Sequence, residues 1–428
     1  MKYKVLINKE NKIKKNYINK ITLIDIKNRN GIDIKIEKET YENYQNLKEF
    51  LCKKNIEIDI ESAYSPLDSD NDYTNEDHTG LAIHIIVDGN IEETQKYLHE
   101  YGFILRYPKD KEKATYHKYD PFHIRYVGKI VAKIIYENNF TLEEYLSTFS
   151  GVLLVNKEKN MTSFDVVKRI SDIYGIKRIG HTGTLDPLAE GLLIITIGQA
   201  TKIAELLTAT YKEYEAGVIL GIKTDTLDIT GRVLDTKSFD ENIDIEKVLK
   251  SFNKTYLQEV PIYSAVKING KKLYEYARKN ESVQLPKKEV TIKNTELLNT
   301  DKATFNFRCT VSKGCYIRSL INDIGLSMNT YATMTKLTRT KQGKFHLKDA
   351  YTLLEIEKGE AKLLSIEQAL DYPVIVVDHI LEYKIRNGQP VKNDWNIEEK
   401  VIFKNEIEKI LGIYEVVENT LKTWKNFN

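Results

Sequence analysis

The chain has 428 residues, of which 41% are hydrophobic and 29% charged, and its formal net charge at pH 7 is +2. This length is sufficient for two or three domains with buried cores, so a single small module is excluded. The near balance of charge excludes a global basic field, and any nucleic-acid site must be a local patch.

Strand-like and helical patterns alternate along the chain without a fixed repeat, which predicts an α+β protein. In the first part, residues 67–77 form an acidic, turn-rich loop, and residues 130–145 have the pattern of an amphipathic helix that closes a first unit. We therefore expect a domain boundary near residues 148–151 and a first domain over residues 1–148.

Beyond this boundary, residues 151–155 and 191–197 predict short buried strands, and residues 162–170 predict a helix with a Thr or Ser cap. From about residue 373 the pattern shortens to small strands at residues 374–377 and 400–403, separated by a turn at residues 387–390. We expect a catalytic domain over residues 150–372 and a small β module over residues 373–428.

The three cysteines, Cys52, Cys309 and Cys315, form neither CxxC pairs nor a dense framework, so we expect reduced thiols without a thiolate metal site. The N-terminus is basic but lacks the apolar run of a signal peptide, and no window approaches the roughly 18 apolar residues of a membrane span. A cytoplasmic protein that does not enter membranes is therefore expected.

A glycine-rich loop precedes the strand at residues 191–197 and reads Gly180-His-Thr-Gly-Thr-Leu-Asp-Pro-Leu-Ala-Glu-Gly191. Its glycines let the backbone adopt conformations that other residues rarely take, so a ligand can approach closely. An Asp before a Pro is often only a turn former, but a polar loop between apolar elements is a frequent place for a site. Spacing alone leaves Asp186 as either a turn former or a catalytic carboxylate.

This loop strongly resembles that of the bacterial tRNA pseudouridine synthase B (TruB-type) family, whose pattern Gly-His-Thr-Gly-x-Leu-Asp-Pro-x-Ala-x-Gly it meets at every fixed position. The resemblance covers about residues 150–428 and continues in order through residues 198–202, 212–214, 224–228, 258–267, 270–278 and 312–318. It implies a pseudouridine synthase fold, with helices flanking a central mixed or antiparallel sheet, and a C-terminal module that resembles a PUA-like RNA-binding domain.

The resemblance implies a cofactor-free isomerisation of uridine 55 in the T arm of tRNA. The glycosidic bond breaks, the base turns while bound, and its C5 joins the ribose. Asp186 matches the essential aspartate, which either attacks C1′ or removes a ribose proton; both routes need an ionised carboxylate in a site shielded from water. Arg318 matches the arginine that pairs with this aspartate.

Other matched positions are expected to bind the RNA. Tyr214 matches the aromatic residue that stacks on the extruded base, and Tyr316 matches a second aromatic residue of the pocket, because the base must leave its stack before it can react. His181 matches the histidine that enters the RNA loop. Leu337 fits the apolar residue under the target base.

Residues 263–278 mix basic and aromatic side chains, among them Lys267 and Lys271, and such a mixture suits RNA phosphates and unstacked bases. Without the family, the same segment also reads as a solvated amphipathic helix. The family's early Lys-Pro-x-Gly-x-Thr-Ser appears as Lys157-Glu-Lys-Asn-Met-Thr-Ser163. Asn160 thus replaces Gly, and Asn adopts a left-handed backbone more readily than most residues.

Five of the eight histidines fall within residues 78–123. This part resembles VanY-type D-alanyl-D-alanine carboxypeptidases through residues 62–64, 79–82, 101–108 and 123–128. The family's zinc pattern is a His two residues before Thr-Gly-Leu-Ala, an Asp two residues after its Ala, and a later Glu-x-x-His. The matching positions are Asp77, His84 and Asp120-Pro-Phe-His123.

Zinc accepts both His nitrogen and carboxylate oxygen, so Asp77, His84 and His123 are candidate ligands of a site with an open position. Asp120 stands where the family has its general base and is one methylene shorter than Glu, and Ser65 replaces a substrate-binding Arg. The resemblance leaves open either an active zinc domain or one that keeps only the fold.

We therefore expect a monomeric tRNA pseudouridine synthase with an unusual first domain. One alternative is a zinc D-Ala-D-Ala carboxypeptidase-like enzyme fused to an RNA-binding module, and another is an RNA chaperone that refolds tRNA without chemistry. The set of Asp186, Tyr214, Tyr316 and Arg318 argues against both alternatives, because a protein that only binds RNA has no need of the acid.

Overall fold

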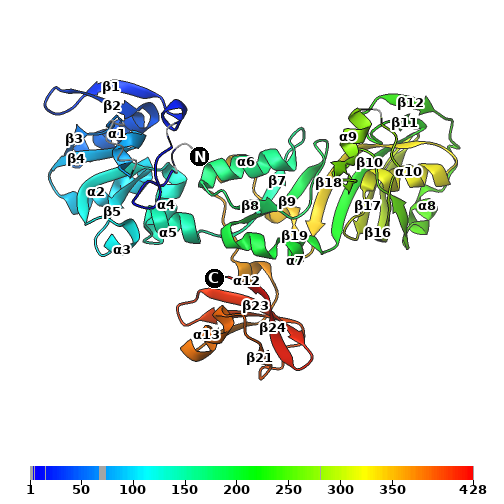
Figure 1. Ribbon diagram of the computed structural model, residues 1–428. Helices are drawn as coiled ribbons and strands as arrows, with labels where there is room; N and C mark the ends of the chain where they lie inside the picture. Colours follow the sequence, from blue (N-terminus) through cyan, green and yellow to red (C-terminus); the bar gives the residue numbers. More distant parts are fainter. Residues whose placement is uncertain (1–2, 4, 15, 67–73, 280, 428) are drawn as a thin grey trace.

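The computed structural model describes residues 3, 5–14, 16–66, 74–279 and 281–427. Figure 1 shows three lobes, which we name the front domain (up to residue 148), the central domain (residues 151–372) and the C-terminal module (from residue 373). Residues 67–73 of the predicted acidic loop lie outside the described residues. No helix in the described part of the chain is long and apolar enough to cross a membrane.

The front domain packs helices against a small sheet. Its elements are η1 (Ile18–Lys20), β1 (Leu23–Lys27), β2 (Asp33–Glu37), α1 (Lys38–Cys52), β3 (Glu57–Ser62), η2 (Glu76–Thr79), β4 (Ala82–Asp88), α2 (Ile91–Tyr97), η3 (Leu98–Tyr101), β5 (Phe103–Tyr107), α3 (Glu112–Thr115), β6 (Asp120–Tyr126), α4 (Lys129–Glu137) and α5 (Leu142–Thr148). The sheet has the order β3-β4-β6-β5, and β1 and β2 form a separate hairpin. Leu47 and Leu51 of α1 are buried with Ile83 and Phe103 of the sheet.

Two helices close the front domain, where the sequence pattern predicted one over residues 130–145. α4 ends at Glu137, Asn139 adopts a left-handed backbone with φ of 51°, and α5 begins after Thr141. The Thr141 side chain and Glu144 form a capping box that satisfies the first free backbone N–H groups of α5. The prediction of a single helix was wrong, because this local cap outweighs the apolar periodicity that spans both helices.

The central domain is built around one long, mixed sheet. Its elements are β7 (Gly151–Lys157), α6 (Ser163–Tyr174), β8 (Ile179–His181), β9 (Glu190–Ile197), η4 (Gly198–Ile203), α7 (Ala204–Thr208), β10 (Lys212–Leu220), β11 (Ile222–Thr224), β12 (Val233–Thr236), α8 (Ile245–Ser251), β13 (Thr255–Glu259), β14 (Lys267–Ile268), β15 (Lys271–Lys272), α9 (Leu273–Arg278), β16 (Lys287–Asp301), β17 (Thr304–Val311), α10 (Ile317–Ser327), β18 (Ala332–Gln342), β19 (Phe345–His346), η5 (Leu347–Asp349), α11 (Leu353–Glu357) and α12 (Ile366–Ala369). The strand order is β13-β16-β17-β10-β18-β9-β7, antiparallel except that β18 pairs in parallel with β9.

The C-terminal module contains a second sheet. Its elements are β20 (Val374–Val377), α13 (His379–Arg386), β21 (Val391–Lys392), β22 (Lys400–Asn405), β23 (Ile410–Val417) and β24 (Thr420–Asn426), with strand order β20-β22-β23-β24-β21. The sequence reasoning missed α13, which begins after the N-cap Asp378. Ile402, Ile413 and Phe427 of the module are buried in one cluster with Ile203 of η4 and Ile194 of β9, so the module is packed on the central domain.

One hydrophobic core crosses from the front domain into the central domain. Val131 of α4 and Tyr145 of α5 are buried in the same cluster as Val166 and Ile170 of α6. The hydroxyl of Tyr145 donates a hydrogen bond of 2.7 Å to the carbonyl of Tyr174. The front domain is therefore packed against the central domain, and the limits of the three domains stay predictions.

Candidate active site

Asp186 lies in the loop between β8 and β9 and forms an ion pair with Arg318. The Nε of Arg318 is 2.9 Å from the Oδ2 of Asp186, and the two side chains are 5% and 36% exposed. Arg318 belongs to the first turn of α10, and its Nη1 and Nη2 donate to the carbonyls of Thr226 and Tyr263 at 3.0 Å each. The guanidinium is fixed by three contacts, while the carboxylate keeps an open side toward solvent.

The shape of this loop depends on its glycines. Gly183 and Gly191 have φ angles of 127° and 102°, which side-chain-bearing residues rarely adopt. A Cβ atom on Gly191 would lie 2.5 Å from the carbonyl oxygen of Arg339 on the paired strand β18. The glycines therefore adopt the unusual backbone that the sequence predicted, and Gly191 lets the loop lie directly against the sheet.

Arg339 connects the loop to the sheet and was missed at the sequence level. It is 1% exposed, and its Nε and Nη2 donate to the carbonyls of Leu192 and Gly183 at 2.6 and 3.0 Å. Its Nη1 lies 3.4 Å from the hydroxyl of Tyr214. The segment of residues 335–339 was recognised for Leu337, but nothing in the sequence distinguishes this arginine from an exposed one.

The predicted His181 and Tyr214 both interact with Arg339. His181 ends β8, and burial together with the Arg339 cation lowers the pKa of its imidazole. Tyr214, on β10, is 7% exposed, and burial raises the pKa of its phenol. Both aromatic side chains are therefore uncharged at neutral pH.

Tyr316 and Leu337 complete the set expected near the base. Tyr316 directly precedes α10, its N–H donates to the Oε1 of Gln258 at 2.8 Å, and burial raises the pKa of its hydroxyl. Leu337 lies opposite Ala216 of β10 and is buried in the same cluster as Tyr214. Leu337 and Tyr214 thus lie on neighbouring strands, β18 and β10.

Lys267 and Lys271 lie on a small hairpin rather than on the amphipathic helix that was the alternative reading. β14 and β15 pair across Asn269 and Gly270, whose φ angles are 51° and 80°, and only residues 273–278 are helical. An Asn-Gly pair is the sequence signal of such a turn. Lys267 is exposed, whereas Lys271 forms an ion pair with Glu281.

Of the candidate zinc ligands, Asp77 and His123 lie together, while His84 lies beside the candidate base Asp120. His84 Nε2 lies 3.6 Å from Asp120 Oδ2, and His123 Nε2 lies 3.9 Å from Asp77 Oδ1. His84 Nδ1 contacts Glu61 at 2.7 Å, and the buried Nε2 of His123 has no hydrogen-bond partner. Within the described residues, no three His, Cys, Asp or Glu side chains form a group that could hold a metal ion. This arrangement does not fit a three-ligand zinc site, and whether the front domain binds zinc stays open.

The other three histidines of this segment have separate surroundings. His78 Nδ1 lies 2.7 Å from the carbonyl of Ser65, His99 stacks on Tyr136, and His117 stacks on Tyr107. The five histidines therefore do not form one cluster, although Tyr107 also lies 5.0 Å from His123, whose ring is 6.2 Å from that of His84.

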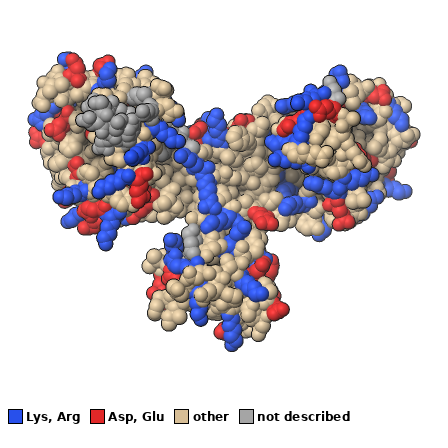
Figure 2. Space-filling view, viewed as in Figure 1, with Lys and Arg blue, Asp and Glu red and all other residues tan. Residues whose placement is uncertain are grey.

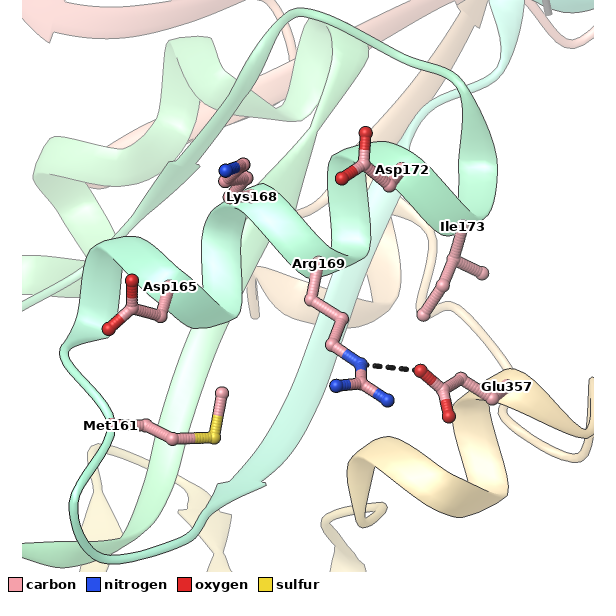
Figure 3. A pocket seen from close by; sticks show the side chains of 7 residues that line it. All are labelled: Met161, Asp165, Lys168, Arg169, Asp172, Ile173 and Glu357. Atoms are coloured by element: carbon pink, nitrogen blue, oxygen red, sulfur yellow. Dashed lines mark hydrogen bonds and ion pairs between the residues drawn. The ribbon is translucent and has the colours of Figure 1, made fainter. Parts of the chain in front are cut away.

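The central domain contains a cavity and a groove. A cavity of about 670 Å³ is lined by Thr226 and Tyr263, whose carbonyls hold Arg318, together with residues of β13 and α10. A groove of about 500 Å³ lies between α6 and α11, where Arg169 reaches across to pair with Glu357 (Figure 3). Acidic and basic side chains alternate in this groove, so it offers no surface of one sign to a charged ligand.

The chain was compared with known proteins. Residues 171–317 match the family model described as TruB family pseudouridylate synthase (N terminal domain), and residues 318–382 match that of the tRNA pseudouridylate synthase B C-terminal domain. Residues 71–129 match D-alanyl-D-alanine carboxypeptidase (VanY). Both resemblances inferred from the sequence motifs are confirmed.

Comparison with individual proteins gives the same result as comparison with the family models. The chain is 43% identical over 284 residues to tRNA pseudouridine synthase B of Bacillus cereus, covering 62% of this chain and 92% of that protein. It is 40% identical over 257 residues to the corresponding protein of Caldanaerobacter subterraneus subsp. tengcongensis, covering 59% and 90%. A chain in a solved H/ACA RNP bound to a substrate RNA containing 2′-deoxyuridine has a TM-score of 0.51 at 20% identity, covering 68% of this chain and 88% of its own. The predicted fold of the central domain is confirmed.

Proposed function

This chain belongs to the tRNA pseudouridine synthase B family, and on this premise we propose that it converts uridine 55 in the T arm of tRNA to pseudouridine, with Asp186 as the catalytic carboxylate. That the chain is a pseudouridine synthase acting on RNA follows from its family. The choice of uridine and the roles of the residues are the proposal. The observation that most supports the role of Asp186 is its ion pair with Arg318 at 2.9 Å.

The reaction balances without a co-reactant. The N1–C1′ bond of the uridine breaks, the base turns, and a C5–C1′ bond forms, while C5 loses its proton and N1 gains one. Asp186 acts either as a nucleophile at C1′ or as a base toward the ribose, so no cofactor is required. Arg318 is held by the carbonyls of Thr226 and Tyr263 and keeps the Asp186 carboxylate in one orientation. This lowers the entropic cost of bringing the carboxylate into the reactive geometry.

The base is expected to lie against Tyr214, Tyr316 and Leu337. An extruded base loses its stacking in the RNA, and aromatic side chains replace part of that interaction. His181 is uncharged at neutral pH because burial and Arg339 lower its pKa, so it enters an RNA loop without adding charge. Lys267 presents its exposed charge to the RNA backbone.

The peptidase alternative is less well supported, because Asp77, His84 and His123 do not form a three-ligand group among the described residues. We further expect a monomer, since one chain carries all of the residues named for the reaction, and a cytoplasmic location, where tRNA is found.

The assignment is tested with a T-arm stem-loop labelled with tritium at C5 of uridine 55, without added metal. We expect the wild-type protein to release the label, and Asp186→Ala to release none while binding the RNA with similar affinity. Asp301→Ala, which removes an exposed carboxylate from the end of β16, is the matched control and is expected to be fully active. Turnover by Asp186→Ala would contradict the assignment.

A further inference from the structure

Three basic side chains from separate segments gather where the central domain meets the C-terminal module. Arg178 directly precedes β8, Lys202 lies in η4, and Lys425 lies in β24. Arg178 donates through Nε to the hydroxyl of Thr201 at 2.7 Å, next to Lys202 in the chain. Lys202 in turn donates to the carbonyl of Asn426 at 2.6 Å, next to Lys425. The three cations are thus brought together by the packing of the module on the central domain.

The charge of this cluster is not balanced by acids. Within the described residues, no ion pair joins Arg178, Lys202 or Lys425 to a carboxylate, and these side chains contact a hydroxyl, an amide oxygen, a carbonyl and aromatic rings. Burial, Arg178 and Lys425 all lower the pKa of Lys202, in keeping with like charges held close together. Figure 2 shows Lys and Arg atoms gathered where the three lobes meet, with few Asp or Glu atoms among them.

The position of the cluster connects it to the candidate active site. Arg178 directly precedes the short strand β8 and His181 ends it, so the two residues lie about 10 Å apart at the rise of a β-strand. An RNA backbone that passes His181 can therefore reach the cluster within a few nucleotides. Lys202 also holds the C-terminal segment in place through Asn426, which fixes the module beside this path.

We propose that Arg178, Lys202 and Lys425 form a binding site for backbone phosphates of the RNA substrate, outside the pocket that holds the reacting uridine. This inference rests on the proposed function and adds to it a second place of contact. Neighbouring cations that have no carboxylate partner repel one another, and a bound anion relieves this repulsion. The anion that the RNA substrate provides is its backbone phosphate. Contacts of this kind set register and affinity rather than base specificity.

The test uses the full-length protein and a tRNA transcript, with the dissociation constant measured over a range of KCl concentrations. Lys425→Gln removes a charge whose side chain lies over the ring of Trp424 and makes no hydrogen bond within the described residues, and Lys202→Gln removes the central cation. We expect each variant to bind about five- to tenfold more weakly and to lower the slope of log Kd against log salt by about 0.7–0.9. Lys422→Gln, on the same strand and exposed, is the matched control and is expected to match wild type.

The possible results separate the site from the function. A salt slope unchanged in Lys425→Gln, or equally lowered in Lys422→Gln, would overturn the site while leaving the proposed function standing. Conversion of saturating RNA at the wild-type rate in the same variants would support a contact made outside the reacting pocket. Competition by inorganic phosphate at millimolar concentration would show a free-anion site and overturn the RNA assignment. Wild-type protein without turnover would instead contradict the proposed function.

Discussion

Replacing Arg339 with Lys tests whether this buried guanidinium positions the catalytic loop. Arg339 joins three elements, because it donates to the carbonyls of Gly183 in the loop and Leu192 in β9 and approaches the hydroxyl of Tyr214 in β10. Lysine keeps the charge but has one ammonium group on a flexible stem, and it cannot reach acceptors in these three directions at once. The substitution therefore removes the connection and keeps the cation.

The loss of stability in Arg339→Lys can be estimated from the two hydrogen bonds that Arg339 donates to carbonyl oxygens. A hydrogen bond from a charged donor contributes about 1.5–3 kcal/mol, and a contact of 3.4 Å, as to Tyr214, contributes little. Lysine retains at most one of the two carbonyl bonds, so the free energy of unfolding is expected to fall by about 2–3 kcal/mol. For a chain of 428 residues, the entropy of unfolding is about 0.9 kcal/mol/K, so the melting temperature falls by roughly 2–3 °C.

The effect on catalysis comes from displacement of the loop. Gly183 stands three residues before Asp186, and a shift of a fraction of an ångström at the reacting atoms lowers the rate by about 10- to 100-fold. We expect kcat to fall by this factor while the dissociation constant for tRNA changes little, because Arg339 is buried and does not face solvent. The result therefore distinguishes positioning from binding.

The assay is single-turnover conversion with saturating RNA, at a temperature where circular dichroism shows the variant to be folded. Thr340→Ser, the neighbouring position on β18, serves as a control that leaves the Arg339 contacts in place. If Arg339→Lys reacts at the wild-type rate under these conditions, Arg339 only stabilises the fold and the reasoning is refuted.

Arg339→Gln removes a cation that lowers the pKa of His181, so a proton NMR titration should show that pKa rising toward the ordinary value of about 6.5. Because the pKa of His181 is lowered in the folded protein, its contribution to the free energy of unfolding is fully present above about 6.5 and is lost as the pH falls through the folded-state pKa. The variant should therefore lose less stability than the wild type on acidification. Tyr145→Phe removes a buried hydrogen bond between front and central domains and should lower the free energy of unfolding by about 1–2 kcal/mol, measured with urea. Asn160→Ala should cost about 1 kcal/mol in the same experiment, since Asn160 has a φ of 65°, whereas Asn160→Gly should be neutral or stabilising. Elemental analysis should find less than one zinc per chain, unchanged in His84→Ala; one full equivalent lost in that variant would establish a live metal site.

Several elements of the fold could be predicted from short stretches of sequence. The apolar runs at residues 151–155 and 191–197 became β7 and β9, whose residues are buried along almost their whole length. The helix predicted from residue 162 begins there, because Thr162 and Asp165 form a capping box. Asn160 has the left-handed backbone expected of a residue that replaces Gly. In each case, neighbouring residues alone determine the conformation.

The site could be read only in part. Asp186 and Arg318 were recognised by motif, and they do meet, but the groups that hold Arg318 are the carbonyls of Thr226 and Tyr263. Every residue has a carbonyl, so no side-chain pattern reveals which ones will accept a hydrogen bond. Arg339 was missed for a similar reason, since its burial follows from the packing of β18 against β9 and β10 rather than from its neighbours in sequence.

Buried contacts give the front domain a structural role. Arg106 is fully buried, and it pairs with Glu76 of the same domain at 2.7 Å and with Glu143 of α5 at 2.7 Å. Breaking a buried ion pair leaves an uncompensated charge and costs about 3–5 kcal/mol, so α5 is held firmly by the peptidase-like fold. Since α5 also contributes Tyr145 to the core shared with α6, the front domain stabilises the central domain whether or not it binds zinc. Loss of metal ligands would therefore leave this structural role intact.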